Sequence, residues 1–176
     1  MNDFAHSLSL DRIRDGDRID IIADEAECRA VAARLGLKSI DRFEAHAALL
    51  REGEAIRATG RLKASLEQSC VATGEPVPAH VDEAFDLSFL PEPKASEPDE
   101  EQELSPAELD VIFHDGAAID LGGAIADTLA LALDPYPRSA GAEDALKEAG
   151  VIGEDEAGPF AALAALKEKM GRDQPG

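Results

Sequence analysis

The sequence predicts an α+β fold in which a curved antiparallel β-sheet packs against three to four helices. Between residues 40 and 90, apolar and polar residues alternate with a period of two, which is typical of strands with one buried face. Residues 24–36 and 120–134 instead combine helix caps with apolar residues at helical spacing. Short turn sequences separate the strand patterns, so we expect a meander of about five to six strands.

The N-terminal region predicts two strands followed by a capped helix. Residues 7–13 and 17–24 are rich in apolar and β-branched residues, and an Asp-Gly-Asp sequence between them favours a turn. We therefore expect an N-terminal hairpin. Asp24 and Glu27 have the spacing of a capping box, and Gly36 can end the helix in a left-handed conformation.

The alternating region predicts three long strands, separated by a turn at residues 51–54 and by a Gly-Glu-Pro turn that follows Cys70. Since successive side chains of a strand point to opposite faces, one set should be buried, and Cys70 falls on that side. The residues expected on the buried face are Phe43, Ala45, Ala47, Leu49, Ile56, Ala58, Leu62, Ala64, Leu66, Val81, Phe85, Leu87 and Phe89.

The chain of 176 residues is long enough for a sizeable core and short for two domains, so we expect a single domain over residues 1–176. Residues 91–108 are rich in acidic residues and proline, which predicts a flexible acidic loop. Two short strands and a helix capped by Asp120 should follow. Residues 142–172 then predict a C-terminal helical tail.

The formal net charge is −20, and it is unevenly distributed. Residues 1–64 hold 11 Lys and Arg against 12 Asp and Glu, so residues 65–176 carry a net charge of −19. Such a surface repels phosphate backbones, which disfavours extended nucleic-acid binding and favours basic protein partners. Only two cysteines are present, and neither a secretion signal nor a membrane span is visible, so we expect a cytoplasmic protein without disulfides.

No catalytic residue, metal site or cofactor is expected from the reactive side chains. Cys70 lies on the buried face without a basic neighbour in sequence, so a small packed side chain is the preferred interpretation over a nucleophile. Acidic residues surround Cys28 and oppose its ionisation. Asp82 and Asp86 alternate onto a solvated face. The histidines lack ligand spacing: His6, His46, His80 and His114.

One basic feature is present on the predicted sheet. Arg57, Arg61 and Lys63 share one face of a strand, and Arg42 lies on its neighbour, which would form a modest contact surface for RNA or an acidic partner. If the turn centres on residues 74–75, Asp86 lies roughly opposite Lys63. Cross-strand ion pairing is therefore the preferred interpretation, and a binding surface remains the alternative.

Several stretches occur together in one order: LKASLEQSCVATGEPVPAHVDEAFDLSFLPEP, an acidic interruption, AAIDLGGAIADTLALALDPYPRSAGA and PFAALAALK. This order resembles the YceD family of large ribosomal RNA subunit accumulation proteins, and specifically a member of alphaproteobacterial type. The resemblance covers about residues 40 to 170. The family-motif positions are Cys70, Asp120, Leu121, Gly122, Asp134 and Pro135.

The resemblance implies a non-enzymatic role in accumulation of 23S rRNA and in large-subunit assembly. The implied partner is a large-subunit ribosomal protein or a pre-ribosomal particle, with 23S rRNA itself as a further candidate. The alternative is a direct RNA-binding module that uses the basic strand face. Many relatives carry further cysteines after the second strand and after the long helix, where this chain has Thr73 and DPYPRSAGAEDALKEAG. The resemblance thus implies that turn chemistry and packing replace a metal here.

Overall fold

The computed structural model of the chain describes residue 4, residues 6–92 and residues 111–151. Seven strands and three helices form this part, which confirms the α+β class. The strands are β1 (Ser7–Ser9), β2 (Arg18–Ile22), β3 (Ser39–Glu52), β4 (Ala55–Ser69), β5 (Pro76–Pro91), β6 (Val111–His114) and β7 (Ala118–Asp120). The helices are α1 (Glu25–Leu35), α2 (Leu121–Ala132) and α3 (Ala142–Glu148).

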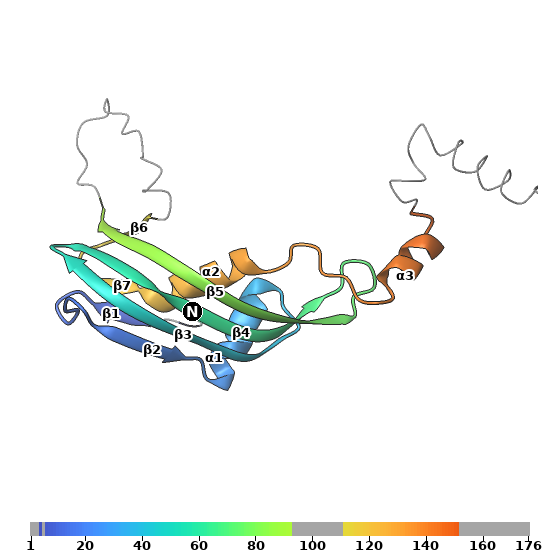
Figure 1. The fold of residues 1–176 in the computed structure, drawn as a ribbon, viewed down its shortest axis with the longest axis horizontal. Helices are drawn as coiled ribbons and strands as arrows, with labels where there is room; N and C mark the ends of the chain where they lie inside the picture. The colour runs from blue at the N-terminus through green and yellow to red at the C-terminus, as the bar shows by residue number, and fades with distance from the viewer. Residues whose placement is uncertain (1–3, 5, 93–110, 152–176) are drawn as a thin grey trace, which may run out of the picture.

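The main sheet has five strands in the order β2-β3-β4-β5-β6. Its first four strands are antiparallel neighbours, whereas β6 joins β5 in parallel. Figure 1 shows the long curved ribbons of β3, β4 and β5, with α1 and α2 behind them and α3 beyond the turn between β4 and β5. In the part of the chain that the structure describes, one face of the sheet is therefore open, and its other face covers the core.

The core lies between the sheet and the two longer helices. Phe43, Leu62 and Phe89 on the strands and Ile125 and Leu129 on α2 are fully buried. Nearly every residue expected on the inner strand face is buried, as the alternation predicts.

Two members of the predicted inner face, Val81 and Leu87, are only half-buried. Among the described strands, β6 pairs only with Ser88–Pro91 at the end of β5. Most of β5 therefore has no outer neighbour in the described sheet, and its inward side chains are less covered.

Local sequence signals explain how α1 begins and ends. The Asp24 carboxylate accepts a hydrogen bond from the Glu27 backbone N–H at 2.8 Å, and the Glu27 carboxylate accepts one from the Asp24 N–H at 2.8 Å. Gly36 ends the helix with a φ of 68°, where a glycine has no steric penalty. The predicted capping box and left-handed C-cap are confirmed.

The predicted N-terminal hairpin is wrong. β1 pairs with β7 in a separate two-stranded sheet, and β2 pairs with β3 at the edge of the main sheet. The Arg51 guanidinium donates hydrogen bonds to the carbonyl oxygens of Leu10 and Ile13, which are both buried. The connection between β1 and β2 is thus held against the β3–β4 hairpin, and this contact between distant residues overrides the local turn signal.

Two predicted segments extend past the described residues. β5 ends at Pro91, which is the first residue of the predicted acidic loop. Residues 93–108 of that loop lie outside the described part. α3 forms the start of the predicted C-terminal tail, and residues 152–172 lie outside it. The single-domain organisation stays a prediction. Within the described ranges, no helix is long and apolar enough to cross a membrane.

The Gly60→Ala substitution should destabilise the sheet, because an added Cβ would overlap the His46 carbonyl oxygen and lie 2.6 Å from the ring of Phe85. A backbone oxygen cannot rotate away, so we expect a loss of at least about 2 kcal/mol in the free energy of unfolding. Urea denaturation measures this quantity. Gly141→Ala is the matched control, since its Cβ would meet nothing within 4 Å. Equal stabilities of the two variants would contradict the close packing at Gly60.

Candidate functional site

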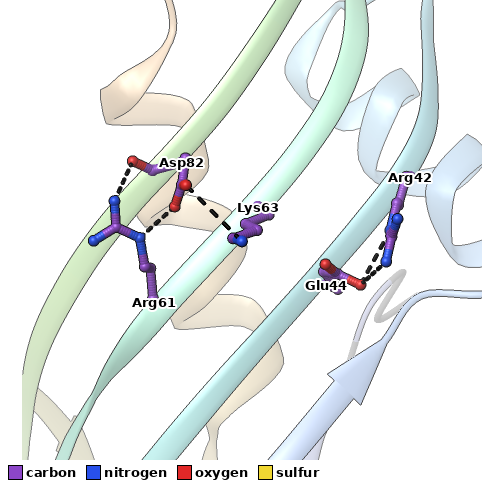
Figure 2. A network of polar contacts seen from close by, with 5 residues as sticks. All are labelled: Arg42, Glu44, Arg61, Lys63 and Asp82. Carbon is purple, nitrogen blue, oxygen red and sulfur yellow. Dashed lines mark hydrogen bonds and ion pairs between the residues drawn. The ribbon is translucent and has the colours of Figure 1, made fainter.

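The open face of the main sheet carries the predicted basic residues, and carboxylates accompany them. The Arg57 Nε donates to Asp86 Oδ1 at 2.7 Å, and Arg61 forms an ion pair with Asp82. Lys63 Nζ lies 4.0 Å from the second oxygen of Asp82, as Figure 2 shows. The preferred interpretation of cross-strand pairing is therefore confirmed.

The register of that pairing differs from the prediction. Lys63 lies opposite Asp82, and Asp86 lies opposite Thr59. The pair of Ser69 and Pro76 encloses a turn of residues 70–75, whose centre is two residues earlier than the Gly-Glu-Pro sequence indicated. When the centre of a hairpin moves by two residues, the residue opposite each strand position moves by four. The same strands therefore still supply the cations and carboxylates, but Lys63 lies opposite Asp82 and not Asp86.

Arg42, the fourth predicted basic residue, also has a carboxylate partner. Its guanidinium donates two hydrogen bonds to Glu44 on the same strand, at 3.1 and 2.7 Å (Figure 2). Arg42 and Lys63 line one hollow, and Lys63 shares the exposed face of β4 with Arg57 and Arg61, so the four basic residues lie on one surface. Three carboxylates lie among these four cations, which leaves little unpaired positive charge.

The ion pairs shift the ionisation of their members in the expected directions. The hydrogen bonds and charges of Asp86 and Asp82 raise the pKa values of Arg57 and Arg61, respectively. The same guanidinium groups lower the pKa values of Asp82 and Asp86. All four groups remain charged at neutral pH, so the pairing persists there, but solvent exposure keeps its contribution to stability small.

A second cluster joins the turn after β4 to the segment after α2. The Val71 N–H donates to the Pro137 carbonyl at 2.9 Å, and the Thr73 and Ser139 hydroxyls lie 3.2 Å apart. The Cys70 sulfur accepts the backbone N–H groups of Thr73 at 3.4 Å and Ser139 at 3.3 Å. We call this cluster the Cys70 junction; it fixes the segment of residues 134–139 against the sheet.

Cys70 is buried, as its place in the strand alternation predicts, but its ionisation differs from the expectation. Hydrogen bonds from Ser139, and then from Thr73, lower the pKa of Cys70 to about 6. The main donor is 69 residues away, so no sequence neighbour could indicate it. Cys28 behaves as expected, because burial and the nearby Glu27 and Asp24 raise its pKa.

The Cys70 junction does not have the composition of a metal centre. Thr73 and Ser139 offer hydroxyl groups beside a single thiol, whereas structural zinc sites use four Cys or His ligands. Across the residues that the structure describes, no group of three or more His, Cys, Asp and Glu side chains is arranged to hold a metal ion. Hydrogen bonds join the turn and the segment in this part of the structure.

The family-motif positions lie at the two ends of α2. At its start, the Asp120 carboxylate caps the helix by accepting the Gly123 N–H at 3.0 Å, and Leu121 is fully buried. Gly122 allows the N-terminal backbone to approach, since an added Cβ would overlap the Phe4 carbonyl and lie 2.6 Å from the His6 nitrogen. These three positions have structural explanations.

At the other end of α2, Asp134 and Pro135 begin the segment held by the Cys70 junction. The Asp134 carboxylate accepts a hydrogen bond from the Tyr136 N–H at 2.9 Å. The backbone carbonyl of Asp134 accepts one from the buried side-chain amide of Gln68 at 2.8 Å. Pro135 lines a hollow of about 500 Å3 between the end of α1, the end of β4 and the end of α2. We call this hollow the apolar groove; its apolar lining includes Leu35, Leu37, Val71, Leu131, Leu133 and Pro135.

The apolar groove has exposed hydrophobic residues at its rim. Leu131 is 88% exposed and Val71 is 55% exposed, and both line the groove. Tyr136, on the same segment as Pro135, is 72% exposed. This surface was not among the sequence-based predictions, although Leu131 lies off the helical spacing of Leu121, Ile125 and Leu129 and could have indicated it.

The fold and these surfaces define an acidic protein of the α+β class with an ion-paired sheet face and an apolar groove. A family model described as "Large ribosomal RNA subunit accumulation protein YceD" matches residues 58–167. The chain therefore belongs to the YceD family. No curated protein and no solved structure matches the chain. The alphaproteobacterial type of the resemblance stays a prediction.

The two thiols should titrate at different pH values. In a Cys28→Ala variant, the remaining Cys70 should ionise near pH 6, whereas in a Cys70→Ala variant the remaining Cys28 should ionise above the ordinary value of 9.0. Thiolate absorbance at ultraviolet wavelengths follows both titrations. Each variant is the control for the other, and a Cys70 that ionises at the ordinary value would contradict the lowering of its pKa by the hydrogen bonds of Ser139 and Thr73.

The low pKa of Cys70 also predicts how stability varies with pH. Because the folded-state pKa lies below the value in the unfolded chain, ionisation of Cys70 stabilises the fold most above the unfolded value. This stabilisation is lost as the pH falls to about 6. The difference in unfolding free energy between the wild type and Cys70→Ala should therefore grow from pH 6 to pH 9. A difference that stays constant in denaturant titrations would contradict the proposed linkage.

Proposed function

We propose that the chain is a non-enzymatic ribosome-biogenesis factor that docks to a basic ribosomal protein or to a pre-ribosomal particle. The family description supports a role in accumulation of the large-subunit ribosomal RNA, which is 23S rRNA in bacteria. Docking would support large-subunit assembly, and the site of action would be the cytoplasm. The family is described by this role and not by a reaction, which favours a binding protein over an enzyme.

The distribution of charge is the observation that carries the docking mechanism. Among the described residues from 65 onward, 13 are Asp or Glu and two are Lys or Arg. Complementary charge accelerates the encounter of two proteins, and salt weakens this effect. Ribosomal proteins that bind RNA carry basic surfaces, so they are suitable partners for such a chain.

The second candidate function is direct RNA binding through Arg42, Arg57, Arg61 and Lys63. One observation favours it, since the four cations share an open sheet face. The ion pairs with Asp82, Asp86 and Glu44 oppose it, because a phosphate would have to compete with carboxylates already in place. Docking to a basic protein therefore remains the preferred function.

Binding to basic large-subunit proteins should depend strongly on salt. Purified ribosomal proteins extracted from the large subunit serve as the probe, and fluorescence anisotropy of the labelled full-length chain reports the affinity. We expect affinity to fall about tenfold or more between about 50 mM and about 300 mM salt. The absence of any binding at low salt would overturn the docking mechanism.

The Asp82→Asn and Asp86→Asn double variant should bind 23S rRNA fragments more tightly than the wild type, because it frees Arg57, Arg61 and Lys63. The matched control is Glu143→Gln with Asp144→Asn, which removes the same charge from α3, where both residues are exposed. Filter binding measures both affinities. Tight RNA binding by the wild type that disappears in an Arg57→Glu, Arg61→Glu variant would instead establish the second candidate function.

A further inference from the structure

We propose that the apolar groove is the docking site for a short apolar segment that is carried by a basic protein. This inference rests on the proposed function and adds to it a surface and the chemistry of the anchor. Its partner is a protein segment with one or two large apolar side chains flanked by Lys or Arg.

The exposure of the rim is the first argument. Leu131 and Val71 are large hydrophobic residues, and both line one hollow of about 500 Å3 while remaining 88% and 55% exposed. Scattered exposed hydrophobic residues are common, but a hollow that gathers them is typical of interaction surfaces. Tyr136, with 72% exposure, adds an aromatic group on the same segment, and aromatic residues are enriched at protein interfaces.

The rigidity of the groove is the second argument. The Cys70 junction fixes residues 134–139 through the bonds of Val71 to Pro137 and of Ser139 to the Cys70 sulfur. The buried Gln68 amide holds the Asp134 carbonyl at 2.8 Å. A surface that is already ordered loses little entropy on binding, so the apolar contacts contribute more of their free energy to affinity.

The charge of the groove lining favours a basic docking segment. Among the described residues that line the groove, Asp134 is the one charged residue and none is Lys or Arg. Of the described residues from 65 onward, which include two of the three elements that form the groove, 13 are Asp or Glu and two are Lys or Arg. An acidic segment or an RNA phosphate would meet repulsion here, whereas basic residues beside an apolar anchor would be attracted. The anchor therefore belongs to a basic protein.

Other occupants of the apolar groove can be distinguished by experiment. The sequence predicts an amphipathic helix at residues 159–170, which lies outside the described residues and carries Phe160, Leu163 and Leu166. This segment, a second copy of the chain, or RNA could each contact Leu131 instead. The test must therefore identify the neighbour of Leu131 directly.

The first experiment replaces Leu131 by the photoreactive residue p-benzoylphenylalanine in the full-length chain and irradiates it with isolated precursors of the large subunit. We expect crosslinks to a ribosomal-protein peptide in which apolar residues lie beside Lys or Arg. The same group at the exposed Thr59, on the open sheet face, is the control and should not crosslink to that peptide. Crosslinks from position 131 mainly to residues 152–176, to a second copy or to RNA would overturn the inference.

The second experiment measures affinity for the same precursor particles. Leu131→Asp and Val71→Asp should each weaken binding about tenfold or more, with an unchanged melting temperature, because both side chains are exposed. Ile22→Asp, at a residue 69% exposed on the edge strand β2, is the matched control and should bind like the wild type. Normal binding by both groove variants would overturn this inference alone, whereas no binding by the wild type would overturn the proposed function as well.

Discussion

The structure depends on the burial of one face of a long, curved sheet against α1 and α2. β4 and β5 pack against α2, whose Leu121, Ile125 and Leu129 are all fully buried, and β3 packs against α1. The packing of these two helices on the sheet forms one apolar core in a chain with only 4% aromatic residues. It also fixes the position of both ends of α2, so every surface described here follows from it.

The two ends of α2 serve different purposes. At its start, Gly122 and the Asp120 cap allow the helix to begin against the N-terminal backbone. At its end, residues 134–139 are held by the Cys70 junction, and Leu131 and Pro135 reach the apolar groove. The family match over residues 58–167 covers both ends of the helix and the Cys70 turn. The Cys70 thiol thus accepts hydrogen bonds that join the turn after β4 to the segment after α2.

Much of the fold could be predicted because its signals are local. The alternation of β3 and β4 and the capping box at Asp24 each depend on residues a few positions apart, and the structure confirms them. The pairing of β1 with β7 depends on residues more than 100 positions apart, so the turn before β2 suggested the wrong partner.

The ion pairs were predictable in kind but not in register, because the centre of a six-residue turn cannot be read from its Gly-Glu-Pro sequence. Leu131 alone could have indicated an exposed apolar position on α2, but the groove itself was not predictable, since three separate elements form it. The same holds for the low pKa of Cys70, whose donor Ser139 is distant in sequence.

The central claim is that this acidic chain acts by docking to a basic protein on the large subunit while it is being assembled. The position of the native protein in a density gradient of cell extract tests it most directly. At low salt the protein should sediment with precursors of the large subunit, and high salt should release it to the top of the gradient. Free migration of the protein at every salt concentration would contradict the claim.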